Sequence, residues 1–404
     1  MFDKLYTYEK LRLKDFSTTY MRALYNKFFG DDRMIAIVGA RGVGKSTLML
    51  QYLKHLKENH ADNASIYFSM DYPFLASMNL LEFCEKFVAS GGEFLLIDEI
   101  HKYKEFALHL KAIYDLFPTL KIVVTGSCAI SILNAKADLS RRMSIFKMHG
   151  LSFREYLEIK HGVALPMMEL GSLVANHIEI AEKITNESRP NIYKEFKTYL
   201  SSGYYPFCFD KKENYALTLL STINLTLEND LVALGLIEYK YSYKLKKLLE
   251  VICESEPFEV NISKIATTAE ISRASLYEYL GFLHDGQMIT LIEQSSKGVK
   301  KIAKPAKIYL HNTNLLGVYC NSAKTGTLRE TFFVNQLSYA HKIELAEQGD
   351  FLVAGNDKTY YFEIGGESKG FEQIRDIPNS YLAIDVERSN HPNKIPLWCF
   401  GFLY

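Results

Sequence analysis

The sequence predicts an α/β fold in which a parallel sheet carries helices on both faces and smaller domains follow. Short apolar segments alternate with segments whose apolar residues recur at helical spacing, the pattern of strand–helix–strand units. The first apolar segment, residues 34–38, leads through a glycine-rich loop directly into a helical segment. The length of 404 residues exceeds what one hydrophobic core holds, and at about 100–200 residues per domain it indicates roughly two to four domains.

The composition is that of a globular protein without net charge. Lys and Arg together number 47, Asp and Glu together number 47, and 48% of residues are hydrophobic. This balance excludes a histone-like basic protein and an acidic disordered chain, although it leaves room for a local basic patch. The first ten residues lack the apolar core of a signal peptide, and no segment approaches the roughly 18 apolar residues of a membrane span. We therefore expect a cytoplasmic protein with no membrane partner.

The cysteines give no sign of a metal site or of a disulfide framework. The six are widely scattered and never form a C-x-x-C pair. Reduced thiols are the simplest expectation for all of them, in keeping with a cytosolic protein. They are Cys84, Cys128, Cys208, Cys253, Cys320 and Cys399.

A phosphate-binding motif follows the first predicted strand. Residues 39–46 read GARGVGKS and match G-x-x-x-x-G-K-[S/T], with a strand before and a helix after, as this P-loop requires. The backbone N–H groups of such a loop and the start of its helix point at phosphate oxygens. We expect Lys45 to bind the β- and γ-phosphates of ATP and the Ser46 hydroxyl to coordinate Mg²⁺. The expected nucleotide-binding residues of the loop are Gly39, Ala40, Arg41, Gly42, Val43, Gly44, Lys45, Ser46 and Thr47.

A second apolar strand ends in two carboxylates. Residues 93–100 read EFLLIDEI, and residues 65–71 read as a further strand of the same sheet. Asp98 is placed to hold Mg²⁺ through its waters, and Glu99 to orient and deprotonate the attacking water. The alternative is that both carboxylates are simply solvated at the end of a strand. The phosphate-binding loop predicted in the same sheet favours the functional interpretation.

Further polar residues follow a third strand, residues 121–125. Ser127, or Thr125, is a candidate to sense the γ-phosphate by hydrogen bonding, with a plain turn as the alternative. Arg141 and Arg142 are candidates to reach the γ-phosphate, from the same subunit or from a neighbour in a homo-oligomer. A solvated arginine pair at a helix end is the alternative for these two residues.

These motifs resemble those of a group of prokaryotic AAA+-like ATPases, the archaeal-type ATPases and related signalling NTPases. The chain carries, in order, GARGVGKST, YFSMD, LLIDEIHKY, KIVVTGS, LSRR and LSFREYL, where members typically have GxRRVGKTTL, LDEIQ, VTGSS, LSGR and LSFREFL. The sequence departs at Gly42, which replaces a second arginine, and at Arg141, which replaces a glycine, so that the family arginine corresponds to Arg142.

The resemblance implies an ATPase followed by three further parts. We expect an ASCE/AAA+-like P-loop ATPase domain at residues 1–157 and a helical lid or linker at 158–242. A winged helix at 243–312 and a small α/β restriction-endonuclease-like, or PD-(D/E)xK-like, domain at 326–404 complete the expected order.

Residues 243–309 read as three helices and two wing strands. Ser272 is the expected cap of the third helix, in which Arg273 is the one strong donor. A lysine cluster without acidic residues could bind DNA phosphates. Glu278 and Asp285 would repel phosphate, so protein–protein packing by the winged helix remains open. The cluster consists of Lys297, Lys300, Lys301, Lys304 and Lys307.

The C-terminal residues match a PD-(D/E)xK nuclease only in part. Asp350 and Glu363 fit its two carboxylate positions, and Glu330 could assist from the preceding helix. Gly365 stands where the lysine is needed, and Lys369 would have to reach back. We therefore expect no nuclease activity. The apolar ending of the chain predicts a strand that docks into the core.

The function that these observations predict is a Mg²⁺-dependent ATPase that acts as a molecular switch on DNA or protein partners. Its catalytic residues would be Lys45, Glu99 and one of Arg141 and Arg142. One alternative is an ATP-controlled nuclease. The other is a DNA-binding regulator that binds ATP without hydrolysing it.

Overall fold

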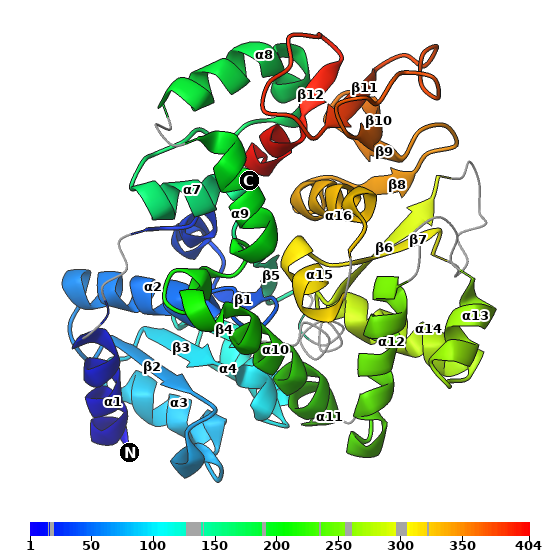
Figure 1. Ribbon diagram of the computed structural model, residues 1–404. Coiled ribbons are helices and arrows are strands. Elements are labelled where there is room, and N and C mark those ends of the chain that lie inside the picture. Colours follow the sequence, from blue (N-terminus) through cyan, green and yellow to red (C-terminus); the bar gives the residue numbers. More distant parts are fainter. Residues whose placement is uncertain are drawn as a thin grey trace. The chain divides into compact units, whose positions relative to one another are not determined.

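The computed structural model describes two compact units (Figure 1). The first comprises Met1–His149 and Asn224–Tyr239, and the second comprises Gly150–Ile223 and Lys240–Tyr404. In the described part of the chain, no helix has both the length and the apolar content needed to cross a bilayer. The described residues are 1–14, 16, 20–126, 139, 141–187, 191–233, 236–254, 261–295, 305–320 and 323–404.

The first unit contains a parallel sheet in the order β2-β3-β4-β1-β5, which confirms the predicted sheet. Strand β4 lies between β1 and β3, so the loops after these three strands meet at one edge. Each strand is a short apolar run because helices cover both faces of such a sheet. The strands are β1 (Met34–Val38), β2 (Ser65–Ser69), β3 (Phe94–Asp98), β4 (Lys121–Gly126) and β5 (Ser144–Lys147).

Helices lie on both faces and along one edge of this sheet (Figure 1). Helices α3 and α4 pack on the face that carries Met34, Ala36 and Val38, and α2 covers the opposite face. Helix α1 runs beside β2, the edge strand. These helices are α1 (Phe2–Lys14), α2 (Lys45–Asn59), α3 (Leu80–Ala89) and α4 (Phe106–Leu116), with the short 3-10 helices η1 (Ala23–Phe29), η2 (Pro73–Leu75) and η3 (Ile100–Lys102).

A second chain segment completes the first unit. This segment begins at Asn224, near the end of helix α10 (Tyr215–Leu225), most of which belongs to the second unit. It continues through one π-helical turn, η6 (Thr226–Asp230), into α11 (Leu231–Ala233). π-Helical turns are rare and frequently lie at functional sites. This turn buries Asp230, which is 2% exposed, within the unit that carries the phosphate-binding loop.

The second unit is built on a mixed seven-stranded sheet in the order β12-β11-β10-β9-β8-β6-β7. Helix α7 begins with a capping box in which Ser152 and Glu155 bind each other's backbone, which accounts for the S-x-x-E pattern of LSFREYL. The strands are β6 (Ile289–Gln294), β7 (Lys307–Leu310), β8 (Ile343–Leu345), β9 (Phe351–Ala354), β10 (Thr359–Gly365), β11 (Ser380–Ile384) and β12 (Lys394–Pro396). The helices include α7 (Phe153–His161), α8 (Leu170–Glu187), α9 (Ile192–Ser202), α15 (Thr313–Tyr319) and α16 (Thr325–Leu337).

The elements predicted for the winged helix follow one another in the expected order. They are α12 (Ser242–Glu254), α13 (Ile262–Thr268), α14 (Arg273–Asp285) and the antiparallel pair β6–β7. Ser272 caps α14, as predicted. Strand β6 also pairs in parallel with β8, so this hairpin belongs to the same sheet as the C-terminal strands.

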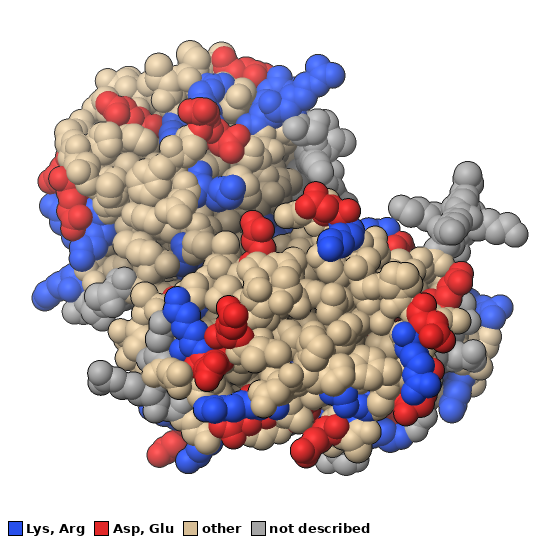
Figure 2. Space-filling model, turned by 90° about the horizontal axis from the view of Figure 1, so that it is seen from above, with Lys and Arg blue, Asp and Glu red and all other residues tan. Residues whose placement is uncertain are grey.

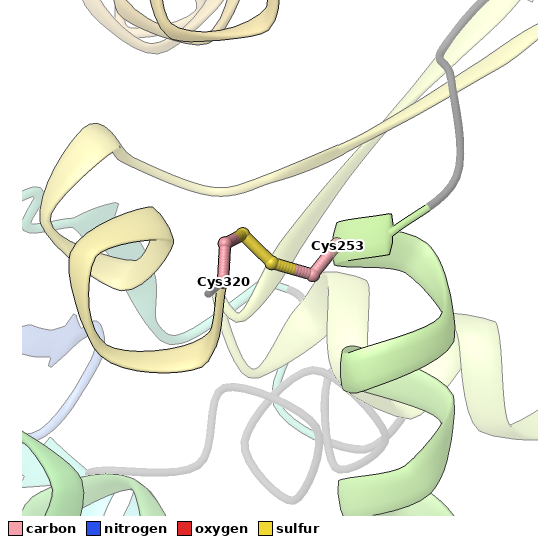
Figure 3. Close-up of a disulfide and its surroundings, with 2 residues drawn as sticks. All are labelled: Cys253 and Cys320. Carbon is pink, nitrogen blue, oxygen red and sulfur yellow. A yellow bond between two sulfur atoms is a disulfide. The ribbon is translucent and has the colours of Figure 1, made fainter. Parts of the chain in front are cut away.

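Two cysteines of the second unit form a disulfide (Figure 3). Cys253 lies near the end of α12 and Cys320 directly follows α15, with Cα atoms 5.6 Å apart. The expectation of free thiols is therefore wrong for this pair, because the fold joins positions 67 residues apart that no sequence pattern connects. Cys84, Cys208 and Cys399 are free and buried, and Cys128 lies outside the described residues.

The apolar end of the chain docks into the core of the second unit without forming the predicted strand. After β12, residues Leu397–Phe402 form the 3-10 helix η8, and all six are buried. A short, continuously apolar run is compatible with a buried strand or with a buried helical turn, because every side chain is covered in both. The sequence pattern therefore could not distinguish the two.

Candidate nucleotide-binding site

The glycines of the phosphate-binding loop stand where the backbone requires them. Gly44 caps α2 with a φ of 100°, and Gly42 has a φ of 81°, both in the left-handed region that favours glycine. A Cβ on Gly39 would lie 2.2 Å from the carbonyl oxygen of Met148. The loop between β1 and α2 therefore has the tight course that the motif predicts.

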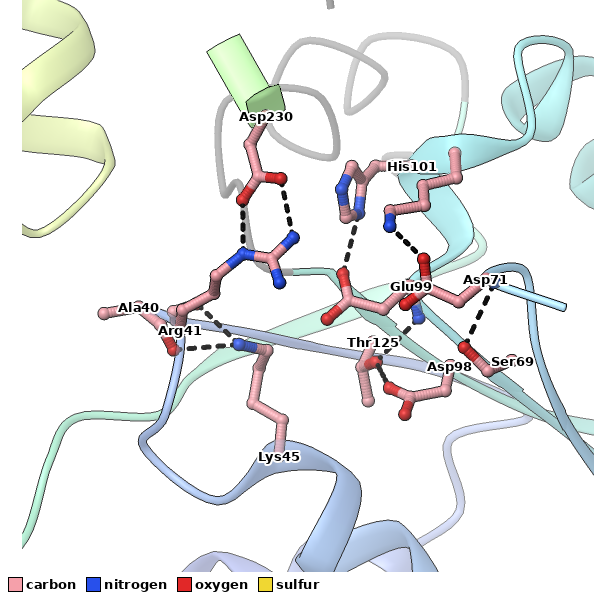
Figure 4. A network of polar contacts seen from close by, with 12 residues as sticks. Ala40, Arg41, Lys45, Ser69, Asp71, Asp98, Glu99, His101, Thr125 and Asp230 are labelled. Carbon is pink, nitrogen blue, oxygen red and sulfur yellow. Dashed lines mark hydrogen bonds and ion pairs between the residues drawn. The ribbon is translucent and has the colours of Figure 1, made fainter. Parts of the chain in front are cut away.

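Lys45 is the first residue of α2 and is turned back onto its own loop (Figure 4). Its ammonium donates to the carbonyl oxygens of Gly39, at 2.8 Å, and Ala40, at 2.9 Å. Burial lowers the pKa of Lys45, while the negative charges of Glu99 and Asp98 oppose that shift. Next to it, Ser46 is half-buried and Thr47 exposed. A buried ammonium at a helix start is a site suited to a phosphate.

Asp98 is held by its two neighbouring strands. It is 3% exposed at the end of β3. The hydroxyl of Tyr67, on β2, donates to Oδ2 at 3.0 Å, and the hydroxyl of Thr125, on β4, donates to Oδ1. A fixed carboxylate and the hydroxyl of Ser46 are hard oxygen donors of the kind that Mg²⁺ prefers. The residues present therefore fit a magnesium nucleotide.

Glu99 adopts a strained backbone conformation beside Asp98. Its φ is 53° and its ψ 43°, in the left-handed region that residues other than glycine seldom occupy. Its N–H donates to the Thr125 hydroxyl at 3.1 Å, and its Oε2 lies 3.3 Å from Nδ1 of His101. Burial lowers the pKa of His101, which the Glu99 carboxylate partly offsets. Thr125 thus ties both carboxylate residues to the end of β4.

Arg41 joins the phosphate-binding loop to a distant acidic residue (Figure 4). Its Nε and one terminal nitrogen donate to the two carboxylate oxygens of Asp230, at 2.9 and 2.7 Å. These hydrogen bonds raise the pKa of Arg41. Because the guanidinium is half-buried and the carboxylate almost wholly buried, this two-point pair is better placed than a surface pair to hold its geometry.

Three residues of the site were not predicted as site residues from the sequence. Tyr67 and His101 stand in the motifs YFSMD and LLIDEIHKY, and Asp230 stands in none, but no pattern marks any of them as a contact of a predicted site residue. Thr125 was one of two alternatives for the polar residue after the third strand, and it lies at the site. Ser127, the other alternative, lies outside the described residues.

The structure does not bring Arg142 to the loop of its own unit. Strand β5 runs parallel to β1 with Ser144 opposite Ile35, so Arg142 lies at the sheet edge where the strands begin, whereas the loop follows their ends. Its guanidinium instead binds both carboxylate oxygens of Asp115, each at 2.9 Å. Arg141 is exposed. A contact with phosphate in the same subunit is therefore not supported.

The lysine cluster is smaller than the sequence suggests. Lys307 is buried on β7, with its ammonium 3.1 Å from Glu330 and 3.6 Å from Asp350, so it cannot serve as an exposed DNA contact and that expectation is wrong. Arg273 opens α14 and donates to the Ser263 hydroxyl at 2.5 Å. The other members, Lys297, Lys300, Lys301 and Lys304, lie outside the described residues.

Charges of both signs are mixed on the surface. Figure 2 shows one face on which described Lys and Arg side chains lie singly or beside Asp and Glu, without a broad patch of one sign. A basic face is the usual electrostatic footprint of nucleic-acid binding. The described residues form no such basic surface on the face shown in Figure 2.

The nuclease-like positions of the second unit are occupied by ion pairs. Glu363, on β10, is 1% exposed and pairs with the ammonium of Lys369, so the lysine does reach back over Gly365. Among the described residues, no group of three potential metal-binding side chains lies together. Each of the two candidate carboxylates therefore has a lysine beside it, Lys369 at Glu363 and Lys307 at Asp350.

Comparison with known proteins supports the assignment of the first unit. Residues 31–157 match the family model described as "AAA domain", and residues 193–324 match a domain of unknown function (DUF8612). An uncharacterized protein of Methanocaldococcus jannaschii is 26% identical over 73% of this chain and 64% of its own length, so the match spans less than two thirds of that relative. An uncharacterized protein of Haemophilus influenzae is 23% identical over 89% of this chain and 90% of its own.

Three of the solved structures to which this chain shows some similarity are compared by identity, coverage and TM-score. The S. cerevisiae Hsp104–ADP complex shares 16% identity over 68% of this chain and 41% of that chain, with a TM-score of 0.31. AMPPCP-bound DnaA from Aquifex aeolicus shares 13% identity over 65% of this chain and 84% of that chain, with a TM-score of 0.26. C. elegans PCH-2 shares 16% identity over 69% of this chain and 67% of that chain, with a TM-score of 0.25. At these TM-scores the similarities are loose. Residues 31–157 are thus similar to an AAA domain, and the parallel sheet with its glycine-rich loop gives the first unit a P-loop α/β fold.

Proposed function

We propose that the protein is a Mg²⁺-dependent ATPase that works as a molecular switch. The observation that carries this proposal is the arrangement of three residues in one unit. Lys45 opens the helix after β1, while Asp98 and Glu99 end β3, with Thr125 of β4 bound to both acidic residues. The match of residues 31–157 to an AAA domain supports the same function.

Each residue has a defined task in this reaction. Mg²⁺, when bound, would neutralise charge on the phosphates, with Ser46 and Asp98 as its protein donors. Lys45 exchanges its two carbonyl partners for phosphate oxygens. Glu99 accepts the proton of the attacking water, and His101 limits the positions that the Glu99 carboxylate can take.

The pair Arg41–Asp230 supports a switch. Residues 224–239 belong to the first unit, yet on both sides they continue into residues of the second unit. A phosphate that draws Arg41 away from Asp230 would loosen this segment. The covalent connections would then carry the change to the second unit, where the partner site is expected.

Two variants test the ATPase. With Lys45→Ala, binding of a fluorescent ATP analogue should fall at least tenfold, whereas Glu99→Gln should bind the analogue normally and lose turnover. Lys54→Ala, an exposed lysine on the same helix, is the matched control. Turnover that survives Lys45→Ala would contradict the proposal.

ATP turnover with and without DNA, together with the mass of the protein with and without nucleotide, tests which partner the protein has. Nucleotide-dependent assembly of a homo-oligomer would support a role of Arg142 in a neighbouring subunit. Stimulation of turnover by DNA, lost when Arg273, Lys297, Lys300, Lys301 and Lys304 are made neutral, would support DNA as the partner over a protein. DNA binding without turnover would instead support the non-hydrolysing regulator.

One observation favours a second candidate, the ATP-controlled nuclease. Lys369 pairs with Glu363 and so supplies a lysine where the regular spacing lacks it. Lys307, however, pairs with both Glu330 and Asp350, and our proposal remains that the domain does not cleave DNA. Mg²⁺-dependent cleavage by the purified protein that Asp350→Ala abolishes would overturn it.

A further inference from the structure

A buried carboxylate of helix α1 accepts a hydrogen bond from the edge strand of the first unit's sheet. Strand β2 is an edge strand, whose outer N–H groups have no strand partner. Glu9, on α1, is 2% exposed and accepts a hydrogen bond from the backbone N–H of Tyr67 at 2.9 Å. Lys57 of α2 lies 2.7 Å from the other oxygen of Glu9. The helix is thus fastened at one residue of the edge strand.

Tyr67, which donates this hydrogen bond, also contacts the proposed magnesium site. Tyr67 is 1% exposed, and its hydroxyl donates to Oδ2 of Asp98 at 3.0 Å. The other oxygen of Asp98 is held by Thr125, so the two hydroxyls together fix the rotation of the carboxylate. A continuous path of two hydrogen bonds therefore runs from Glu9 on α1 to Asp98.

A second residue of α1 acts at the same end of β2. Arg12 lies three positions after Glu9. Burial acts to lower its pKa, but Tyr67, Tyr72, whose side chain it hydrogen-bonds, and Asp98 together raise it. Residues three apart lie on neighbouring positions of a helix surface. Helix α1 therefore approaches the Asp98 side of the sheet through two polar side chains.

We propose that Tyr67 is a positioning residue for Mg²⁺ and that α1, through Glu9, holds Tyr67 in place. The inference rests on the proposed ATPase and adds to it a role for Tyr67 and for helix α1, which lies outside the AAA match at 31–157. Groups that hydrogen-bond a metal-binding side chain typically change metal affinity by about 10–100-fold when they are removed. Loss of the Tyr67 hydroxyl leaves one buried oxygen of Asp98 without its donor, so Thr125 alone holds the carboxylate.

The test compares nucleotide binding with and without metal in the full-length protein. Fluorescent ATP analogue is bound in EDTA, and Mg²⁺ is then titrated to find its half-saturating concentration. Tyr67→Phe should raise that concentration roughly tenfold and leave the affinity in EDTA unchanged. Tyr52→Phe, a buried tyrosine of α2 whose ring packs on Phe28, is the control and should change neither value.

Glu9→Gln tests the role of the helix separately. The amide keeps an acceptor for the Tyr67 N–H and loses the ion pair with Lys57, so we expect the same direction of change with a smaller size. Circular dichroism melting reports whether each variant is folded.

The outcomes separate this inference from the proposed function. A folded Tyr67→Phe variant with the wild-type Mg²⁺ midpoint would overturn the inference, and so would an equal loss of affinity in EDTA, because that would indicate general damage to the site. A wild-type protein that binds the analogue without any dependence on Mg²⁺ would instead contradict the proposed function. If Tyr67→Phe does not fold, the same Mg²⁺ titration of Glu9→Gln decides, and a wild-type midpoint there counts against α1.

Discussion

The guanidinium of Arg41 binds both carboxylate oxygens of Asp230, a residue 189 positions away in the sequence. One partner belongs to the phosphate-binding loop and the other to a π-helical turn whose chain continues into the second unit. Asp230 also contributes negative charge at Lys45. An incoming phosphate would compete with this carboxylate for the same cations.

Replacing Asp230 by Asn should therefore strengthen nucleotide binding. The variant removes the competing charge near Arg41 and Lys45, so we expect ATP affinity to rise about three- to tenfold, equivalent to about 1 kcal/mol. Thermal stability should fall at the same time, because a half-buried guanidinium loses its charged partner. Calorimetric titration with ATP and a melting curve measure both effects.

The control for this variant is Asp71→Asn, which breaks the more exposed ion pair with Lys102. Its effect on affinity should be smaller. Weaker ATP binding by Asp230→Asn would mean that the carboxylate positions Arg41 for phosphate and does not compete with it.

His149 should make the first unit less stable in mild acid. Burial, with Arg22 and Lys147 nearby, lowers the pKa of His149 to about 4, whereas the unfolded chain has the ordinary value of about 6.5. Below pH 6.5 the unfolded state binds the proton more readily, so stability is complete above that pH and is lost as the pH falls toward 4. For a single group this amounts to about 2 kcal/mol between pH 7.5 and pH 5.

Urea unfolding at these two pH values, with fluorescence to follow the transition, measures the loss. His149→Gln should flatten the pH dependence, and His60→Gln, at an exposed histidine, should leave it unchanged. An equally steep dependence in His149→Gln would assign the loss to other groups.

Arg142 should matter for turnover only if subunits assemble. In the structure it binds Asp115 at the edge of the sheet opposite the loop, so Arg142→Ala should not change ATP turnover at concentrations where the protein is monomeric. Turnover should fall where mass measurement finds an oligomer. Asp115→Ala breaks the same ion pair and is the matched control. Loss of turnover in monomeric Arg142→Ala but not in Asp115→Ala would point to a contact in the same subunit.

The local pattern of the sequence was enough to predict the parallel sheet of the first unit and its phosphate-binding loop. The strand–loop–helix around Lys45 and the acidic end of β3 follow from short-range spacing, which fixes where a parallel sheet gathers its loops. Asp230 and Tyr67 could not be predicted in this way. Asp230 reaches the loop only through the fold of a distant segment, and Tyr67 belongs to the strand motif YFSMD, which gives no sign of its hydrogen bond to Asp98.

The second unit shows the same limit more strongly. The helices and hairpin of residues 242–310 follow from periodicity and from Ser272 as a cap. The charge of Lys307 suggests a surface residue, but β7 joins the sheet that carries the C-terminal carboxylates, and the lysine is buried among them. The disulfide of Cys253 and Cys320 likewise depends on a packing that single-sequence spacing does not encode.

Lys307 should be a structural residue of the second unit. Lys307→Met leaves Glu330 and Asp350 without their common cation, and removing one partner of a buried ion pair costs about 3–5 kcal/mol. We expect a clear drop in the melting temperature and no change in affinity for DNA. Lys342→Met, which breaks the exposed pair with Glu344, is the control and should alter the melting temperature little. A stable Lys307→Met variant with weakened, salt-sensitive DNA binding would return this lysine to the DNA-binding cluster.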